Sequence, residues 1–420
     1  MIAVPIADLV EQIIGPDLPV AFEAYDGSRC GPEHAPAKIL VKSPDAIRRI
    51  VTAPGELGLG RAYVAGDLDL EGDVFAALEL RRRLSKVRFT PGQWRAAFEL
   101  VGLDGLRPLP APREEAHLHG RRHTRERDAA AIAHHYDVSN AFYRIVLGPS
   151  MTYSCAVWDS SATTLEAAQE AKYELICRKL GLEPDMRLLD VGCGWGGMVM
   201  HAARHHGVRS VGVTVSRRQA ELAAKRAADA GLADQVEIRL QDYRDVRGEQ
   251  FDAISSIGMF EHVGIAQLGA YFDRLFTLLV PGGRLLNHAI GRPATTKHRL
   301  VSARTRFARR GFIDRYVFPD GELHEIGSIV SALQRTRFEA RHMESLREHY
   351  ALTLRAWVRN LEAGWDDAVA EGGEARARIW RLYMAGSAVN FEDGNIQVHQ
   401  VLAVKPASGT SGMPLRPVFS

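Results

Sequence analysis

A glycine-rich stretch, LLDVGCGWGG at 188–197, has the composition of a turn that holds a nucleotide cofactor. An apolar run ends at Asp190, and the glycines after it let the backbone approach a ligand closely. The stretch also satisfies the dinucleotide fingerprint GxGxxG, which expects an acidic residue about 20 positions later, but the next strand, SVGVTVS, ends in Thr214. A carboxylate just before the turn suits a sulfonium ion better than a pyrophosphate. The stretch therefore predicts S-adenosylmethionine, the alternative being a turn that only packs a strand against a helix.

Two polar residues that can do acid–base chemistry follow apolar, strand-like segments. Glu261 comes just after FDAISSIG, and His288 ends GRLLNHAI. In a parallel sheet, both positions fall on the rim where the cofactor is expected. The alternatives are a carboxylate that complements a helix dipole at Glu261 and a satisfied core histidine at His288.

Cys155 and a cluster of three histidines also carry reactive side chains, but their sequence context does not indicate a catalytic or metal-binding role. Cys155 has no histidine beside it in the sequence to activate its thiol, so we do not expect it to act as a nucleophile. His201, His205 and His206 in HAARHH have a spacing that metal ligands use, but no carboxylate lies nearby in the sequence. We expect a solvated helix face there and no metal site.

The surrounding sequence divides into regions of different pattern. Residues 1–110 combine helix-like and strand-like segments and predict a small α+β domain, and 111–128 form a charged linker. From residue 165 helix-like and strand-like segments alternate, which predicts a parallel sheet covered on both faces within a catalytic domain at 129–405. A long basic insertion at 292–335 is expected to act as a lid, and 406–420 as a disordered tail.

Composition is ordinary for a globular protein: 420 residues, 46% hydrophobic, 25% charged and a formal net charge of +2. Nothing in it requires nucleic acid. Basic clusters at 81–89, 120–127 and 297–310 suit an anionic membrane surface. Four cysteines without CxxC or zinc-ligand spacing indicate a reducing cytoplasm. The N-terminus lacks a basic leader and no apolar run is long enough to span a bilayer, so we expect peripheral membrane contact only.

Several further segments jointly resemble the cyclopropane-fatty-acyl-phospholipid synthase family of methyltransferases. They are HHYDVSNAFYRIVLGPSMTYSCAVW, SIGMFEHVG, FIDRYVFPDGEL, HYALTLRAW and NIQVHQVL. The resemblance covers 134–404 and extends less distinctly to GLGRAYVAGDLD, which is similar to the lipid-associated first domain of the long members. Pattern and resemblance together predict an α/β fold, the Rossmann-like S-adenosylmethionine-dependent methyltransferase fold with a mostly parallel seven-stranded sheet, plus the small α+β domain. Long members often form homodimers.

The resemblance implies methyl transfer to a cis double bond of unsaturated phospholipid acyl chains, and a carbocation that loses a proton to bound bicarbonate to give a cyclopropane. Loss of a different proton, or a hydride shift, would give a methylene or methyl branch instead. The groups that the family uses to hold bicarbonate match Cys155 and Ile290 by backbone and Glu261, His288 and Tyr350 by side chain. A carboxyl group and bicarbonate can share one hydrogen.

The resemblance also implies a set of cofactor-binding residues. They are Tyr153, Ser154, Asp190, Gly192, Gly194, Gly196, Thr214, Gln219, Asp242 and Tyr243. Without the motif, Asp242 reads equally as a turn aspartate that closes a strand. Tyr136 and Tyr143 are expected to wrap over the cofactor beside the substrate, where their ring faces would stabilise a cation, the alternative being ordinary helix packing.

The sequence departs from the family pattern at two places. Ser387 stands where a cysteine is common, which excludes a thiol nucleophile there. His324 with Glu325 replaces a Pro-Ser pair, so we expect the lid to differ in shape from that of other members. Other functions remain open: a small-molecule N- or O-methyltransferase, a non-catalytic lipid-binding protein and, last, an oxidoreductase.

Overall fold

A computed structural model describes most of the chain. The described residues are 4–84, 90–93, 100, 102, 107–116, 127, 138–294, 311–319 and 321–419, without the side chains of 81–84. The chain divides into two compact units. The first draws on 1–117, 297–319 and 361–389, and the second on 118–296, 320–360 and 390–420. The first unit thus takes in 361–389, a segment that we expected in the catalytic domain.

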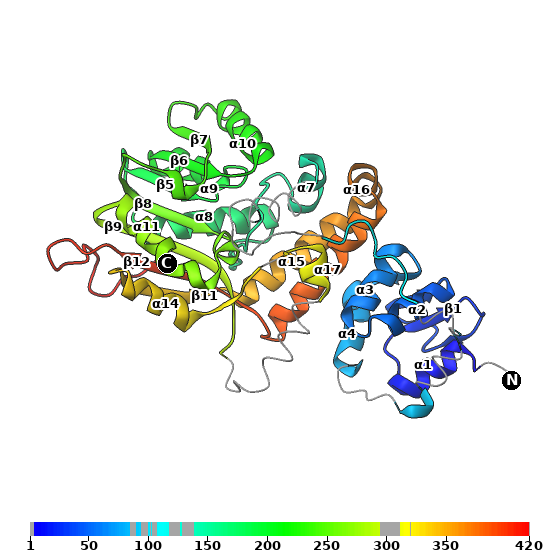
Figure 1. Cartoon of the computed structure of the whole chain (residues 1–420). Helices are drawn as coiled ribbons and strands as arrows, with labels where there is room; N and C mark the ends of the chain where they lie inside the picture. The colour runs from blue at the N-terminus through cyan, green and yellow to red at the C-terminus, as the bar shows by residue number, and fades with distance from the viewer. Residues whose placement is uncertain are drawn as a thin grey trace. The chain divides into compact units, whose positions relative to one another are not determined.

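The first unit is a small α+β structure in which the strand-like segments VAFEAY and AKILVK form two central strands (Figure 1). Its sheet has the order β2-β1-β3-β4, with β1 and β3 parallel and the two edge pairs antiparallel. The elements are α1 (Ile6–Ile14), β1 (Ala21–Ala24), β2 (Arg29–Cys30), β3 (Ala37–Val41), α2 (Pro44–Thr52), α3 (Glu56–Ala65), β4 (Leu68–Gly72), α4 (Val74–Leu84) and α13 (Phe312–Tyr316).

Buried arginines of the long helix α17 (Glu374–Glu392) explain why 361–389 belong to the first unit. Arg378 donates to the carbonyl of Tyr63 at 3.1 Å and pairs with Asp69 at 3.0 Å. Arg381 donates to the carbonyl of Leu70 at 3.1 Å. Removing such buried charges from their partners is costly, so these contacts fix the helix to the α3–β4 region.

The second unit contains the expected sheet, in the order β11-β12-β9-β8-β5-β6-β7, with the short β10 paired to β9 as an eighth strand. Strands β5 to β9 run parallel to one another, whereas β12 runs antiparallel to both β9 and β11. The strands are β5 (Arg187–Val191), β6 (Arg209–Thr214), β7 (Val236–Leu240), β8 (Phe251–Ile257), β9 (Leu279–Arg292), β10 (His324–Glu325), β11 (Glu339–Ser345) and β12 (Gln397–Val404).

Helices cover both faces of this sheet, because neighbouring strand residues point to opposite sides (Figure 1). Leu188 belongs to the apolar cluster under α8 and α9, while Leu189 belongs to the cluster under α11 and α14. The remaining elements of this unit are α7 (Asn140–Leu147), α8 (Leu165–Leu180), α9 (Gly197–His206), α10 (Arg217–Asp229), η2 (Tyr243–Asp245), η3 (Phe260–His262), η4 (Ile265–Gln267), α11 (Leu268–Leu278), α14 (Ile326–Arg335) and most of α15 (Arg347–Ala363). Helix α16 (Trp365–Gly372) belongs to the first unit.

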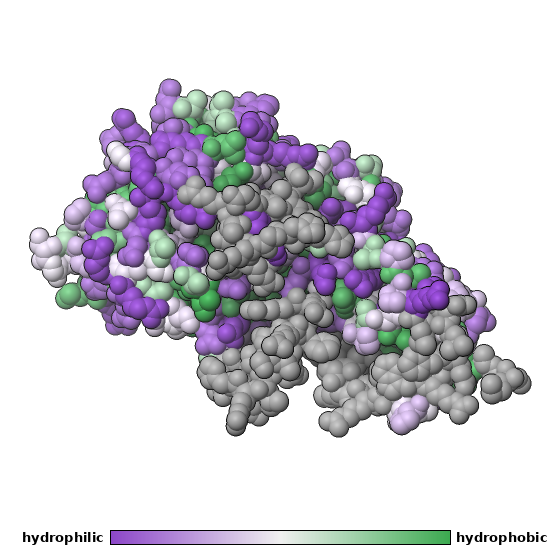
Figure 2. Space-filling view, in the orientation of Figure 1, coloured by the Kyte–Doolittle hydropathy of each residue, from purple (hydrophilic) through white to green (hydrophobic). Residues whose placement is uncertain are grey.

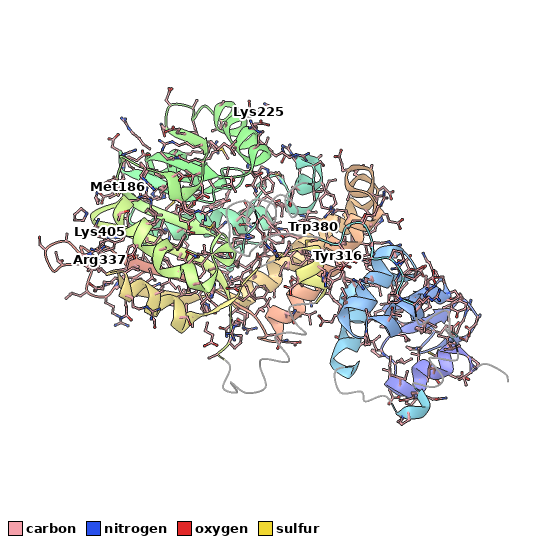
Figure 3. All side chains as sticks on the ribbon, in the orientation of Figure 1. Met186, Lys225, Tyr316, Arg337, Trp380 and Lys405 are labelled. Atoms are coloured by element: carbon pink, nitrogen blue, oxygen red, sulfur yellow. The ribbon has the colours of Figure 1, made fainter. Side chains whose placement is uncertain are left out.

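Charged side chains cover the outer side of α10, and the end of the molecule that carries this helix is largely hydrophilic in Figure 2. Lys225 extends from this helix into solvent and pairs with Asp229 (Figure 3). At the sheet's opposite end, Arg337 and Lys405 both lie over the ring of Phe276, at 4.4 and 4.7 Å from its centroid. These charged side chains therefore lie at the two ends of the sheet, outside its apolar core.

Two regions differ from the expected organisation. The last part of the predicted lid is α14, whose Ile329 and Leu333 are buried in the core beneath the sheet, so it is a covering helix. The tail, predicted to be disordered, is described up to residue 419. It forms a bridge between Ala407 and Thr410, and Phe419 packs edge-on against His342 at 5.0 Å. These contacts give the tail the apolar burial that its composition did not suggest.

Most of the basic segments lie outside the description of the structure: 85–89, nearly all of 120–127 and 297–310. In the part of the chain that is described, no helix has both the length and the apolar character needed to cross a bilayer.

Candidate active site

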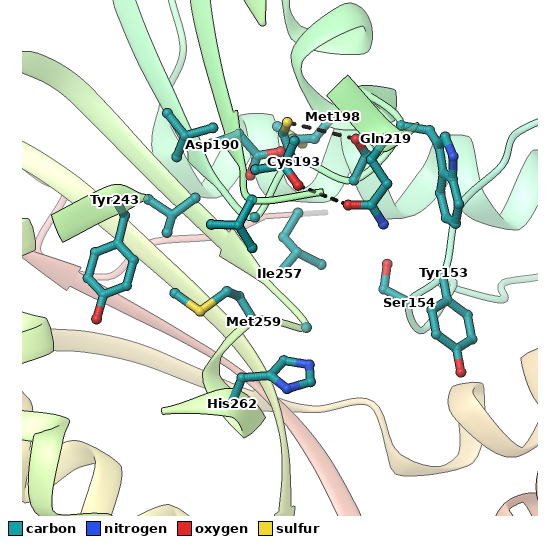
Figure 4. Close-up of a pocket in the computed structure, with 18 of the residues that line it drawn as sticks. Tyr153, Ser154, Asp190, Cys193, Met198, Gln219, Tyr243, Ile257, Met259 and His262 are labelled. Carbon is teal, nitrogen blue, oxygen red and sulfur yellow. Dashed lines mark hydrogen bonds between the residues drawn. The ribbon is translucent and has the colours of Figure 1, made fainter. Parts of the chain in front are cut away.

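A pocket opens at the carboxyl ends of β5, β6 and β8, the edge of a parallel sheet where ligands bind. Its lining comes from the glycine turn, from the residues that follow β6, β7 and β8, and from Met151–Ser154 and α8. Tyr243 and Tyr153 stand on opposite sides of this pocket, with Met259 and His262 between them (Figure 4).

The glycine turn has the backbone conformation that only glycine adopts easily. Gly192 has φ 80°, and its amide together with that of Cys193 donates to the carbonyl of Val213, which ties the turn to β6. At Gly197 the constraint is space: an added Cβ would lie 2.1 Å from the hydroxyl oxygen of Tyr173. That hydroxyl is held 2.7 Å from the hydroxyl of Thr152, so it cannot simply move aside.

Most of the predicted cofactor-binding residues line this single pocket. They are Tyr153, Ser154, Asp190, Gly192, Gly194, Thr214, Gln219, Asp242 and Tyr243. Gly196 is not among the lining residues and instead precedes α9 in the left-handed conformation. Thr214 donates to the Gln219 side chain at 2.9 Å. Asp242 accepts from the amide of Arg244 and pairs with its guanidinium, so it closes a turn and lines the pocket at once.

Two buried charges of opposite sign face the pocket. Asp190 is 2% exposed, and its burial raises its pKa to about 6 even though Ser255 donates to it at 2.7 Å. Burial likewise lowers the pKa of Lys172 to about 7. Lys172 donates to the hydroxyl of Ser154 at 3.0 Å and lies over the ring of Tyr173. A cationic ligand beside Asp190 would favour the charged carboxylate in this dry site.

Lys172 is a pocket residue that was not expected from the sequence. Gln169, Lys172 and Tyr173 share one buried face of α8, and Gln169 donates to the carbonyl of Ser154 at 3.0 Å. The signal that could have indicated them is the spacing of three and four residues between polar side chains, which places them on one face of the helix. They position the Tyr153–Ser154 segment that lines the pocket.

Of the two tyrosines expected over the cofactor, Tyr143 lies in the part of the chain that the structure describes. Tyr136 is outside the described residues. Tyr143 is fully buried, with its ring centroid 4.7 Å from that of Trp195 and 6.1 Å from that of Tyr153. Trp195 and Tyr153 both line the pocket, so Tyr143 packs directly behind its wall.

Glu261 and Ile290, both predicted site residues, are joined by a hydrogen bond. The amide of Ile290 donates to Oε1 of Glu261 at 2.6 Å, while Oε2 is buried without a hydrogen-bond partner. Burial raises the pKa of Glu261 to about 7. The amide of Ile290 is therefore engaged by the carboxyl group rather than directed at an anion.

Glu322 and His324, in the segment that departs from the family pattern, contact the turn that carries Glu261. Nε2 of His324 lies 3.1 Å from the carbonyl of Val263, and the amide of Glu322 donates to the carbonyl of Glu261 at 3.1 Å. The His324 ring packs edge-on against Phe260 at 5.3 Å. His324 thus fixes the turn that carries Glu261.

A chain of buried polar contacts orients His288. Nζ of Lys179 donates to Oε1 of Gln400 at 2.6 Å and pairs with Glu344. A lysine can only donate, so the amide nitrogen of Gln400 must face Nδ1 of His288, at 3.2 Å. Nδ1 is then an acceptor and the proton resides on Nε2, which is buried without a hydrogen-bond partner. Burial lowers the pKa of His288 to about 3, with further lowering from Lys172 and Lys179, so the ring is neutral.

Cys155 and Tyr350 both contact the carbonyl of Leu346, just before α15, Cys155 through its thiol and Tyr350 through its amide. The Cys155 thiol is fully buried, lies 3.6 Å from the carbonyl of Leu346, and has its pKa raised by burial, which does not suit a nucleophile. Tyr350 packs against Trp357 and Phe391, with ring centroids 6.0 and 4.7 Å away. Trp357 in turn lies 5.3 Å from the pocket residue Tyr153, so a run of aromatic rings connects Tyr350 to the pocket.

The expectation of a solvated face for the histidines of α9 is wrong for two of the three. His206 lies 3.0 Å and His201 3.5 Å from the Glu174 carboxylate, whereas His205 is exposed. Glu174 comes from α8, so this carboxylate was distant in sequence and became adjacent through helix packing.

Comparison with known proteins identifies the family. The family model described as mycolic acid cyclopropane synthetase matches residues 123–401. A probable fatty acid methyltransferase of Mycobacterium tuberculosis is 48% identical over 95% of this chain and 94% of the relative. The cyclopropane-fatty-acyl-phospholipid synthase of Escherichia coli K12 is 35% identical over 88% of both. The crystal structure of mycolic acid cyclopropane synthase CmaA1 complexed with SAH and CTAB is 35% identical, with a TM-score of 0.61 over 66% of this chain and 97% of that one.

These matches confirm the resemblance and the fold, and they agree with a pocket built for S-adenosylmethionine at the glycine turn. The chain belongs to the mycolic acid cyclopropane synthetase family of S-adenosylmethionine-dependent methyltransferases.

Proposed function

We propose that the enzyme transfers a methyl group to the cis double bond of unsaturated acyl chains in phospholipids and forms a cyclopropane. The Escherichia coli relative that matches over most of both chains is named for this substrate. The related CmaA1 structure holds CTAB, an amphiphile with a long alkyl chain. The observation that carries the proposal is the pair of buried, unpartnered polar atoms, Glu261 Oε2 and His288 Nε2, beside the cofactor pocket.

S-adenosylmethionine, when bound, supplies the electrophilic methyl group. Asp190 offers the carboxylate that a cationic ligand favours, and Thr214, Gln219 and Tyr243 offer polar and aromatic contacts around it. The glycine turn lets backbone amides come close to the ligand. Lys172 holds Ser154 in place and keeps the opposite wall polar.

We infer that the remaining polar groups hold an anion. Bicarbonate, when bound, supplies a base that can accept a proton from the alkylated chain. Glu261, with a pKa raised to about 7, is partly protonated near neutral pH and can offer a hydrogen from Oε2. His288 can donate from Nε2, because Gln400 occupies Nδ1. Together with Tyr350 and the backbone at Cys155, these residues would hold the anion without a strongly opposing charge.

Cation chemistry on an alkene requires a dry, electron-rich surrounding. The rings of Tyr153, Trp357, Tyr350 and Phe391 follow one another at centroid distances of 4.7–6.0 Å, and Trp357 is fully buried. Aromatic faces stabilise a positive charge and exclude water. We infer that this run of rings shields the carbocation of the acyl chain.

A methylene- or methyl-branched product is the second candidate, because the Mycobacterium tuberculosis relative at 48% identity is named a probable fatty acid methyltransferase. Both products begin with the same methyl transfer and differ in which hydrogen is lost. A small-molecule N- or O-methyltransferase would need neither Glu261 nor His288 in their buried positions.

The test is an assay with the purified full chain, methyl-labelled S-adenosylmethionine and vesicles of cis-unsaturated phosphatidylethanolamine and phosphatidylglycerol. We expect label in the acyl chains, and none with saturated vesicles. Free unsaturated fatty acid provides the comparison substrate. Label only in free fatty acid would contradict the phospholipid assignment, and label in neither would contradict lipid methylation.

We also propose peripheral contact with anionic membranes through the basic clusters at 81–89, 120–127 and 297–310. Exposed charges are screened by salt, so binding should weaken as ionic strength rises. Sedimentation of the protein with anionic and with zwitterionic vesicles, at low and at high salt, measures this directly. Equal binding to both vesicle types would contradict an electrostatic contact.

A further inference from the structure

A compact group of metal-binding side chains lies between α8 and α9, apart from the residues that line the cofactor pocket. Cys177 on α8 and His201 and His206 on α9 each direct a ligand atom to one place, with all three atoms within 4.8 Å of one another. Cys177 is buried and the two histidines are partly buried. Thiolate and imidazole are the ligands that zinc prefers, and four-coordinate sites of this kind are closed and structural.

A carboxylate lies beside the two histidines and offers a fourth ligand. Oε2 of Glu174 lies 3.0 Å from Nε2 of His206 and 3.5 Å from Nε2 of His201, so both imidazoles present the same nitrogen to one carboxylate oxygen. The other oxygen, Oε1, accepts from Arg178 at 2.8 Å. Glu174 is therefore anchored on one side and turned toward the histidines on the other.

One of the candidate ligand atoms, Nε2 of His201, has no hydrogen-bond partner in this group. Nε2 of His201 is buried and makes no hydrogen bond, although the carboxylate is close. A hydrogen-bonded histidine–glutamate pair accounts for His206 but not for the second imidazole or for the thiol. A metal ion at the centre would satisfy all of them.

We propose that Cys177, His201, His206 and Glu174 bind a zinc ion that fastens α8 to α9. The charges balance, because one thiolate and one carboxylate match the two positive charges of the ion. Zinc binding displaces the proton of the Cys177 thiol, which passes to solvent, and no oxidant or reductant is needed.

The zinc ion would also stabilise one wall of the cofactor pocket. Tyr173 immediately precedes Glu174 on α8, and its ring packs at a tilt against that of His201, with centroids 5.6 Å apart. The hydroxyl of Tyr173 contacts Thr152, and both line the pocket. Closing α8 onto α9 therefore fixes Tyr173 against the glycine turn.

The test uses the untagged full chain, with zinc content measured by elemental mass spectrometry and affinity measured by competition with a chromophoric chelator. We expect a single tightly bound zinc ion in the wild type. Cys177→Ser and His206→Gln should each weaken zinc binding by at least ~10–100-fold, because loss of a hydrogen bond to a metal ligand already has an effect of that size. The matched control is His205→Gln, which removes the exposed neighbouring histidine and should bind zinc as the wild type does.

Cobalt substitution gives a readout that does not depend on variant folding. Wild-type protein loaded with Co²⁺ should show the intense near-ultraviolet band of a cobalt–thiolate bond and the visible spectrum of tetrahedral coordination. Zinc retained equally by Cys177→Ser and His206→Gln would overturn the proposal, as would a cobalt spectrum without the thiolate band or a wild type that binds no zinc.

Discussion

Replacing Glu261 with glutamine should change how stability depends on pH. Burial raises the pKa of this carboxyl group from 4.5 to about 7 in the folded protein. The folded state then holds its proton more tightly than the unfolded state does. The contribution of Glu261 to stability is therefore greatest at low pH and is lost as pH rises from 4.5 through 7. Glu261→Gln removes this titration while it keeps an oxygen that can accept from Ile290.

The size of the effect follows from the pKa change. At ~1.4 kcal/mol per pKa unit, the full loss is about 3 kcal/mol, of which about 2.5 kcal/mol falls between pH 5 and pH 8. The difference in unfolding free energy between Glu261→Gln and the wild type should thus move in favour of the variant by about 2.5 kcal/mol over this range. Urea unfolding at both pH values measures it.

A matched control separates this effect from a general response to pH. Glu221→Gln removes an exposed glutamate of α10 and should show no comparable change. Glu261→Gln should also lose methyl transfer while it retains S-adenosylmethionine binding, because Glu261 is not among the pocket-lining residues. A stability difference that stays constant from pH 5 to pH 8 would refute the assigned protonation behaviour.

Three further substitutions test other contacts. Gln400→Leu removes the group that fixes the tautomer of His288, so we expect turnover to fall ~10–100-fold with unchanged cofactor affinity in calorimetry. Gly197→Ala places a Cβ 2.1 Å from a tyrosine hydroxyl, so it should lower the free energy of unfolding by ~1–3 kcal/mol and weaken cofactor binding. The control is Gly386→Ala, whose added Cβ meets no atom within 4 Å and should have neither effect. Glu115→Ala should destabilise the first unit by ~3–5 kcal/mol in denaturant unfolding, because the buried carboxylate pairs with two arginines.

The cofactor half of the site was largely predictable from sequence because its residues are local. Asp190, the glycines after it and Thr214 each sit at a strand end, and the alternation of strands and helices fixes which strand ends share an edge. One expected residue, Gly196, shapes the turn without lining the pocket.

The supporting contacts could not be predicted, because they depend on packing between distant elements. Gln400 meets His288 only through the antiparallel register of β12 on β9. Lys172 reaches the pocket from α8, ahead of the glycine turn, and Glu174 meets the α9 histidines only because the two helices pack together. The tail packs through Met413 and Phe419, two apolar residues in a segment whose composition resembles a linker.

The most direct test of lipid methylation is mass spectrometry of membrane lipids from a bacterial host that makes cis-unsaturated acyl chains, with and without this gene, grown on methyl-deuterated methionine. We predict acyl chains heavier by one methylene group that retain two of the three deuterons of the transferred methyl, as a cyclopropane requires. NMR of the isolated chains then separates a cyclopropane from an exocyclic methylene. Unlabelled lipids, from cells whose purified enzyme binds S-adenosylmethionine in calorimetry, would contradict the account.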